Sequence, residues 1–208
     1  GGKVPFFPRP AVGGWMIAAL IGVALMHSFL STNMSTFIPK YLSDLGQPAS
    51  VYGLMASMLT AGTVIGVLLA GVLGDRFGRR GVIAASLIIA CVPVYLIGLL
   101  GFSPWLYPVV VLAGICIGAA NTSIFVTSQR MFPGSSGLAA GLIMAFMFSS
   151  GTIGTLLCGR LADRAGFPPV FFLTAALVLL GGLLALMLKE PGAEGAKTVS
   201  ALAEISGE

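Results

Sequence analysis

The sequence predicts an all-α membrane protein with six transmembrane helices, arranged as two inverted three-helix repeats. Hydrophobic residues make up 57% of the 208-residue chain and charged residues only 9%, whereas a soluble domain is about 25% charged. The apolar residues form six continuous runs, and one charged, glycine-containing motif occurs twice. Because lipid offers no hydrogen-bond partners and the runs do not alternate as barrel strands do, helices are the expected spanning elements.

The chain divides into three parts by composition. Residues 1–13 carry Lys3, Arg9 and three prolines, and we expect a cytoplasmic lead-in or inter-domain linker there. A hydrocarbon core of ~30 Å requires roughly 20 apolar residues per helix. Six runs meet this length: 14–38, 51–73, 81–101, 105–128, 136–158 and 168–188. The bundle is therefore expected over 14–188, with a polar cytoplasmic tail over 189–208.

The distribution of basic residues predicts the orientation of the six spans. With the N-terminus inside, eight Lys and Arg residues fall in inner segments and three in outer loops. An excess of Lys and Arg marks the cytoplasmic side. Both termini are therefore expected in the cytoplasm.

A repeat relates the two halves of this bundle. At a fixed offset of 88 residues, 11 of the 26 positions in 53–78 are identical to those in 141–166. The repeats are predicted at 14–101 and 105–188. Each contains three spans, an odd number, so the two units must enter the membrane from opposite sides. Inverted repeats of this kind are typical of secondary transporters.

Pairs of glycines four residues apart predict places where helix backbones approach closely. The pairs are Gly62 with Gly66, Gly114 with Gly118 and Gly137 with Gly141.

The more complete copy of the motif resembles a family signature. It reads Gly-Val-Leu-Gly-Asp-Arg-Phe-Gly-Arg-Arg over 71–80 and is predicted to form a turn at the membrane surface. This sequence between a second and a third span is similar to the signature loop of the major facilitator superfamily, whose transporters have two halves of six helices. The resemblance covers about residues 14–188, one such half. It implies a transporter in the bacterial inner (plasma) membrane.

Three features favour the C-terminal half. The copy at 159–166, Gly-Arg-Leu-Ala-Asp-Arg-Ala-Gly, resembles the end of that half in drug-efflux and fosmidomycin-resistance-like members. The fourth span lacks the embedded Arg, and the fifth lacks the Gly-Pro pair, that N-terminal halves of drug antiporters often carry. The six spans are then similar to the seventh to twelfth helices of the family.

The resemblance also assigns roles to the motif. It implies a conformational latch on the cytoplasmic side, made by Gly71, Asp75, Arg76, Gly78, Arg79 and Arg80. Gly159, Asp163, Arg164 and Gly166 form its pseudo-repeat. From the residues alone, the arginines are also explained as topology anchors at the inner interface, and Gly74 and Gly78 as residues that permit a tight turn.

Polar side chains in the spans are the candidates for a substrate-binding cavity. The resemblance implies that the first helix of each triplet lines the cavity, and the polar residues gather in the first and fourth spans. The candidates are His27, Ser31, Asn33, Asn121, Thr122, Ser149 and Ser150. Amide and hydroxyl groups can bind a solute without a buried charge. Hydrogen bonding between helices explains the same residues equally well.

His27 is the only ionisable side chain near the middle of a span. Ionisable residues inside membranes usually face the bundle interior or a wet cavity, and histidine can change its charge near neutral pH. Three roles are open: a neutral histidine bonded across helices, a substrate contact, or a proton carrier. All seven carboxylates lie in loops or in the tail, so the residues do not decide the coupling ion.

The predicted function is secondary active transport of a small organic solute by alternating access, as efflux or ion-coupled exchange. The expected partners are membrane lipids, the solute and another six-helix half, which is part of the same polypeptide, a separate chain or a second copy. No catalytic residue, metal site, cofactor or nucleic-acid partner is predicted. Cys91, Cys116 and Cys158 indicate buried free thiols.

Two other function classes are open at this point. One is a membrane subunit that keeps a half-transporter fold and serves the assembly of a larger complex. The other is an intramembrane serine protease, because Gly134-Ser135-Ser136-Gly137 and a membrane histidine superficially resemble a rhomboid dyad.

Overall fold

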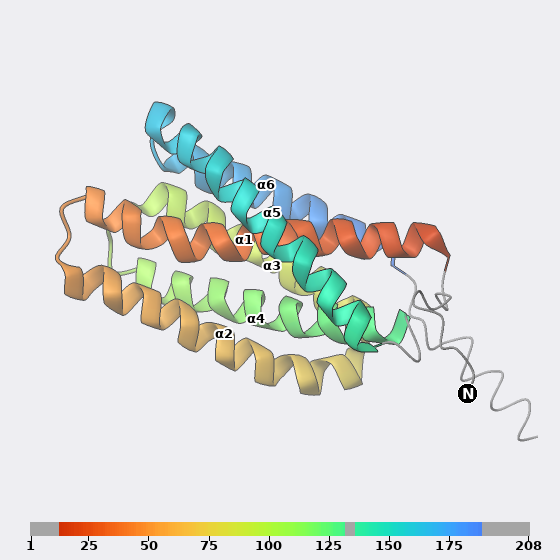
Figure 1. Cartoon of the computed structure of the whole chain (residues 1–208). Coiled ribbons are helices and arrows are strands. Elements are labelled where there is room, and N and C mark those ends of the chain that lie inside the picture. Colours follow the sequence, from red (N-terminus) through yellow and green to blue (C-terminus); the bar gives the residue numbers. More distant parts are fainter. Residues whose placement is uncertain (1–12, 132–135, 189–208) are drawn as a thin grey trace, which may run out of the picture.

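Six helices make up the described part of the chain, residues 13–131 and 136–188 of a computed structural model (Figure 1). They are α1 (Gly14–Asp44), α2 (Ala49–Phe77), α3 (Arg79–Leu100), α4 (Leu106–Met131), α5 (Ser136–Ala165) and α6 (Pro168–Ala185). Each is long and apolar enough to cross a membrane. The predicted fold class is therefore confirmed. The predicted tail and nearly all of the predicted lead-in lie outside the described residues.

The helices differ from the predicted spans mainly at their ends. α1, α2 and α5 continue past the apolar runs to Asp44, Phe77 and Ala165. A helix satisfies its own backbone hydrogen bonds in water as well as in lipid, so it need not end where the apolar run ends. The six predicted spans are confirmed as elements, whereas these three boundaries were placed too early.

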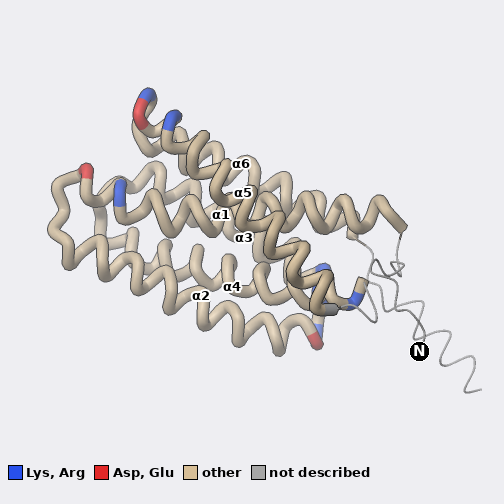
Figure 2. Tube along the Cα trace, viewed as in Figure 1, with Lys and Arg blue, Asp and Glu red and all other residues tan. Residues whose placement is uncertain are grey.

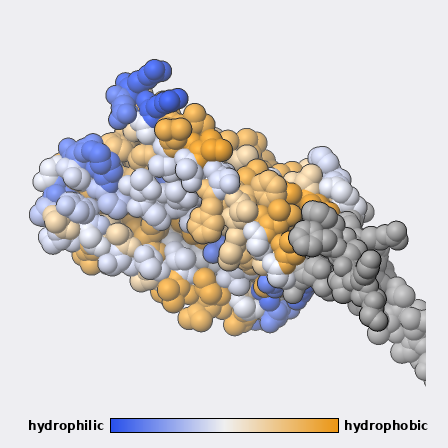
Figure 3. All heavy atoms as spheres, viewed as in Figure 1, coloured by the Kyte–Doolittle hydropathy of each residue, from blue (hydrophilic) through white to orange (hydrophobic). Residues whose placement is uncertain are grey.

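α1 and α4 form the centre of the bundle. α1 packs against α5 and α6, α4 packs against α2 and α3, and α3 packs against α6. Fully buried Leu30, Met34, Ile124 and Phe171 belong to the resulting core. α2 and α5 present large exposed apolar side chains instead, among them Leu68, Val72, Phe148 and Ile153. Figure 3 shows apolar residues across the middle of one face and hydrophilic residues towards its ends, as a membrane-spanning bundle requires.

The two copies of the motif end in the same backbone conformation. Gly78 separates α2 from α3 with φ +80°, and Gly166 lies just before α6 with φ +81°. These positions are equivalent at the 88-residue offset. The two joints lie at opposite ends of the bundle (Figure 1), and the charged residues gather at these ends (Figure 2). The repeat therefore has inverted topology.

The predicted turn over 71–80 is wrong in extent. α2 continues through Phe77 and α3 begins at Arg79, so the connection is Gly78 alone. Gly74 lies inside α2, where the side chain of Arg79 packs across it. The motif therefore consists of the end of α2, the single residue Gly78 and the start of α3.

Replacing Gly78 by alanine is expected to destabilise the protein by about 1–3 kcal/mol. Its backbone, φ +80° and ψ 146°, lies close to a region that is accessible essentially only to glycine. Thermal unfolding in detergent measures the effect. Gly81→Ala is the matched control, because a Cβ there meets no atom within 4 Å. Equal stability of the two variants would contradict the assignment of strain to Gly78.

Two of the three predicted glycine pairs bring backbones together. A Cβ on Gly66 would lie 2.0 Å from the Ile115 carbonyl oxygen, and one on Gly118 would lie 2.0 Å from that of Thr63. α2 and α4 therefore touch through their backbones. The prediction is wrong for Gly137 and Gly141 within this chain, because nothing lies within 4 Å of a Cβ at either position.

Candidate substrate cavity

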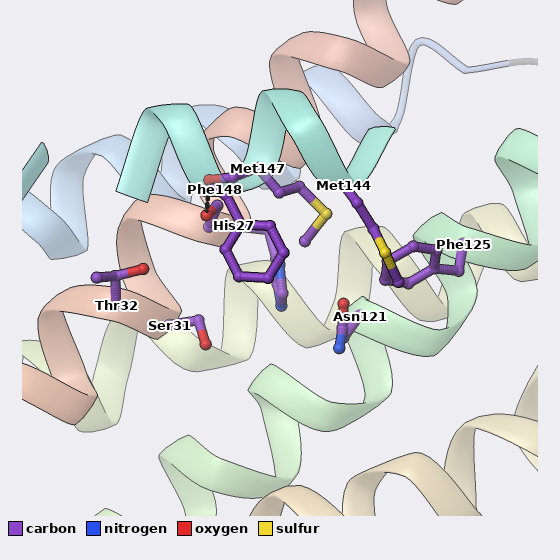
Figure 4. Close-up of a pocket in the computed structure, with 9 residues that line it drawn as sticks. His27, Ser31, Thr32, Asn121, Phe125, Met144, Met147 and Phe148 are labelled. Atoms are coloured by element: carbon purple, nitrogen blue, oxygen red, sulfur yellow. Dashed lines mark hydrogen bonds between the residues drawn. The ribbon is translucent and has the colours of Figure 1, made fainter. Parts of the chain in front are cut away.

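A cavity of about 250 Å³ lies between α1, α4 and α5. It combines neutral polar groups with sulfur and aromatic side chains (Figure 4). Its lining residues are His27, Ser28, Ser31 and Thr32 of α1, Asn121 and Phe125 of α4, and Met144, Met147 and Phe148 of α5. The cavity is therefore built from the two central helices and one flanking helix.

His27 links α1 to α4 at the cavity wall. Its side chain is 1% exposed, and its Nε2 lies 3.0 Å from the backbone oxygen of Ile117. A carbonyl oxygen only accepts hydrogen bonds, so Nε2 carries the hydrogen. Nδ1 is buried and has no hydrogen-bond partner among the described residues. The interhelical bond and the cavity position predicted for His27 therefore occur together.

The surroundings of His27 favour a neutral imidazole. The described acids Asp44, Asp75 and Asp163 all lie within the last turn of their helices, and Figure 2 shows the charged residues at the bundle ends. A buried charge without a counterion is expensive inside a membrane. In the neutral ring with hydrogen on Nε2, Nδ1 is an acceptor. Proton coupling by His27 stays a prediction.

Asn121 and Ser31 are two further polar residues of the cavity wall. Both side chains are partly exposed and line the cavity. The Oδ1 atom of Asn121 is buried and finds no hydrogen-bond partner in the described chain. Leaving a buried acceptor unpaired costs about 1–3 kcal/mol. Two residues of the cavity wall, His27 and Asn121, thus each carry a buried acceptor without a partner in the described chain.

The other four candidates do not line the cavity. Asn33 is fully buried and donates from Nδ2 to Thr174 Oγ1 at 3.1 Å. Thr122 donates to Gly118 O within its own helix at 3.2 Å, and Ser150 donates to Leu25 O at 3.1 Å. Ser149 is exposed. The first three side chains hydrogen-bond within the bundle here, and substrate binding by any of the four stays a prediction.

The apolar part of the wall was not anticipated from the sequence. Phe125 lies one turn after Asn121, a spacing that could have indicated it. Met144, Met147 and Phe148 come from α5, and their position depends on how α5 crosses α1. Ser28 fixes part of that crossing, because its hydroxyl donates to the backbone oxygen of Met147.

Three of the predicted latch residues form contacts within this chain. Arg79 Nη2 lies 3.0 Å from Asp75 Oδ1, one turn apart across Gly78. The Asp75 side chain is 75% exposed. Arg80 donates to the backbone oxygen of Leu186 just after α6, where a cation is favourable because carbonyl groups point outward. The motif therefore ties α2, α3 and α6 at one end and leaves most of Asp75 open to a partner.

The pseudo-repeat shares the backbone of the motif but not its ion pair. Gly166 repeats the positive φ of Gly78. Asp163 and Arg164 are exposed, and neither forms an ion pair within the described part of the chain. Any latch role is therefore better supported at 71–80 than at 159–166.

Comparison with known proteins identifies the family. The sequence profile of the Major Facilitator Superfamily matches residues 19–205. The fosmidomycin resistance protein of Escherichia coli (strain K12) is 35% identical over 125 residues, which cover 60% of this chain and 30% of that protein. The multidrug efflux pump Tap of Mycolicibacterium fortuitum is 26% identical over 155 residues, covering 74% of this chain and 38% of that pump.

A solved structure shows the same fold. The inward-open xylose transporter XylE from E. coli aligns with a TM-score of 0.67 at 17% identity, covering 84% of this chain and 47% of that transporter. The chain thus spans about a third of the length of its curated relatives and about half of the solved transporter.

These findings exclude the serine protease, because the homologues are transporters and not enzymes. Gly134 and Ser135 of its proposed motif lie outside the described residues. The profile match extends over nearly the whole chain, and the observed six-helix fold agrees with it. The chain belongs to the Major Facilitator Superfamily.

Proposed function

We propose that this chain is one six-helix half of a secondary transporter that moves a small organic solute by alternating access. The cavity between α1, α4 and α5 carries the proposal. Its volume of about 250 Å³ is below the roughly 300–1,000 Å³ of complete small-molecule sites. A second six-helix half facing α1 and α4 would supply the remaining wall.

The surface around the cavity supports a partner half. Phe148 lines the cavity and is yet 75% exposed. Large apolar side chains exposed beside a polar cavity mark an interaction surface or contact with lipid. We place this chain in the C-terminal half of a bacterial inner-membrane transporter, with both ends in the cytoplasm. The signature sequences and the distribution of Lys and Arg support this placement.

Efflux is the proposed direction, in keeping with the names of the relatives. No Asp or Glu of residues 13–131 and 136–188 lies near the middle of a helix. A coupling carboxylate, where transport uses protons, therefore belongs to the other half.

Flux measurements in proteoliposomes test the proposal. The complete transporter, with both six-helix halves, is purified and reconstituted, and saturable flux and counterflow are measured for a panel of solutes that includes fosmidomycin and aromatic amines. We expect saturable counterflow of at least one solute. Absence of flux, together with stoichiometric co-purification of non-transporter subunits, would instead support the assembly subunit.

Asp75→Asn is expected to slow turnover about three- to tenfold and to leave the solute KM nearly unchanged. The change removes the charge of an exposed carboxylate that a partner helix N-terminus would favour. Folding stability is expected to change by less than about 1 kcal/mol, since exposed ion pairs contribute little.

Asp44→Asn is the matched control for this variant. Asp44 forms the same i, i+4 type of pair with Lys40, in α1. Normal turnover in Asp75→Asn would leave the motif only its role as a topology anchor.

A further inference from the structure

We propose that the cavity selects solutes that carry N–H donors on an apolar body, through a pair of acceptors formed by His27 Nδ1 and Asn121 Oδ1. The inference rests on the proposed transport function and adds the chemical class of the solute. Three observations lead to it: the hydrogen-bonding state of the two polar side chains, the composition of the remaining wall and the position of the charged residues.

The first acceptor is defined by the bond that His27 makes. Nε2 donates to Ile117 O at 3.0 Å and thereby fixes the position of the hydrogen. Nδ1 then offers a lone pair, and no described residue satisfies it. His27 is a lining residue of the cavity and is 1% exposed, so a solute that reaches Nδ1 must enter through the cavity wall. A solute that donates a hydrogen bond would satisfy this atom.

The second acceptor comes from the facing helix. Asn121 Oδ1 is buried without a partner in the described chain, and its side chain lines the same cavity. Figure 4 shows Asn121 on α4 and His27 on α1, with side chains from α5 beside them. An amide oxygen has two lone pairs. An ammonium or amide group with two N–H bonds could therefore engage both helices together.

The rest of the wall suits an apolar body. Phe125, Phe148, Met144 and Met147 line the cavity next to the two acceptors. Thioether sulfur and aromatic rings pack well against aromatic solutes, and aromatic faces also attract a cation. The wall therefore tolerates a neutral or a cationic solute.

An anionic solute lacks a counterion in this half. Every Lys and Arg of the described residues lies within roughly two turns of a helix end. Figure 2 accordingly shows no basic residue in the middle of the bundle as described. A carboxylate or phosphonate would find hydroxyl and amide donors in this wall but no cation. The wall formed by this half therefore disfavours anions.

Three naphthyl probes test the selection by isothermal titration calorimetry of the purified transporter with both six-helix halves. 2-Naphthylmethylammonium carries N–H donors, its N,N,N-trimethyl analogue has the same charge without donors, and 2-naphthoate is an anion. We expect the primary ammonium to bind about tenfold tighter than the trimethyl analogue, and naphthoate to bind most weakly. The first two probes have the same charge and the same aromatic body, but only the primary ammonium carries N–H donors. The ratio of their affinities therefore measures the preference for N–H donors.

Two variants test whether this ratio of affinities depends on the two acceptors. Asn121→Leu removes one acceptor at similar volume, and its ratio is expected to fall to about three or less. Thr60→Val in α2 is the control, because Thr60 is exposed and bonds only to Ala56 O of its own helix. Its ratio is expected to remain near ten.

Four results would overturn the proposal: equal or tighter binding of the trimethyl probe, tightest binding of naphthoate, binding of none of the probes, or an unchanged ratio in folded Asn121→Leu. None of them would by itself refute transport. Counterflow in proteoliposomes tests that function with solutes of any charge.

Discussion

Replacing Gly66 by leucine is expected to remove most of the folded protein recovered from membranes. A Cβ at this position would lie 2.0 Å from the backbone oxygen of Ile115. Backbone cannot move aside as a side-chain tip can, so α2 and α4 would have to separate. Overpacking commonly destabilises a protein by about 1–3 kcal/mol, and we expect Gly66→Leu to lie at the upper end of this range. We expect the unfolding midpoint in detergent to fall by roughly 6–12 °C.

Gly53→Leu is the control for this prediction. Gly53 lies in the same helix and is exposed, and a Cβ there meets nothing within 4 Å. Replacing an exposed helix glycine favours the helix slightly. Equal loss of folded protein in both variants would show that hydrophobic content, rather than the contact between α2 and α4, caused the effect.

Replacing His27 by alanine is expected to lower kcat/KM for transport at least tenfold, about 1.4 kcal/mol. The change removes the bond to Ile117 O and the only imidazole in the cavity wall. Hydrogen bonds between membrane helices contribute only about 0.6 kcal/mol on average. Folding and insertion should therefore change little. Initial rates of solute flux and the unfolding midpoint, measured on the same preparation, provide the test.

The two measurements separate the roles of His27. A lower midpoint with unchanged flux per folded molecule would reduce it to a bond between helices. Unchanged flux and midpoint would remove it from the site. Thr60→Val, on the outer helix α2, serves as the control for a conservative change in a membrane helix.

The helices and their inverted repeat could be predicted because they depend on local composition. Apolar runs of spanning length identified all six helices, and the identities between 53–78 and 141–166 led to Gly78 and Gly166, which share a positive φ. A close contact of α2 with another helix could also be predicted, because the spacing of Gly62 and Gly66 indicates that two helix backbones approach each other there. The ends of the helices could not be predicted from the apolar runs, because a helix can continue into water without losing its backbone hydrogen bonds.

The cavity could be predicted only in part. His27, Ser31 and Asn121 stood out as polar groups in apolar runs, but Asn33 and Ser150 stood out equally and bond within the bundle. Helical periodicity cannot tell which neighbour satisfies a polar side chain. Met144 and Phe148 were missed because an apolar residue of a cavity wall looks the same in sequence as one that faces lipid.

Cysteine accessibility at Ser31 tests alternating access most directly. Ser31 lines the cavity and lies one turn from His27. Ser31→Cys is introduced after Cys91, Cys116 and Cys158 are changed to alanine, and a membrane-impermeant maleimide is added to inside-out or right-side-out vesicles. We predict that the cysteine reacts from both sides and that a transported solute shifts the ratio of the two rates. Reaction from one side only, unaffected by any solute that the protein moves, would contradict alternating access through this cavity.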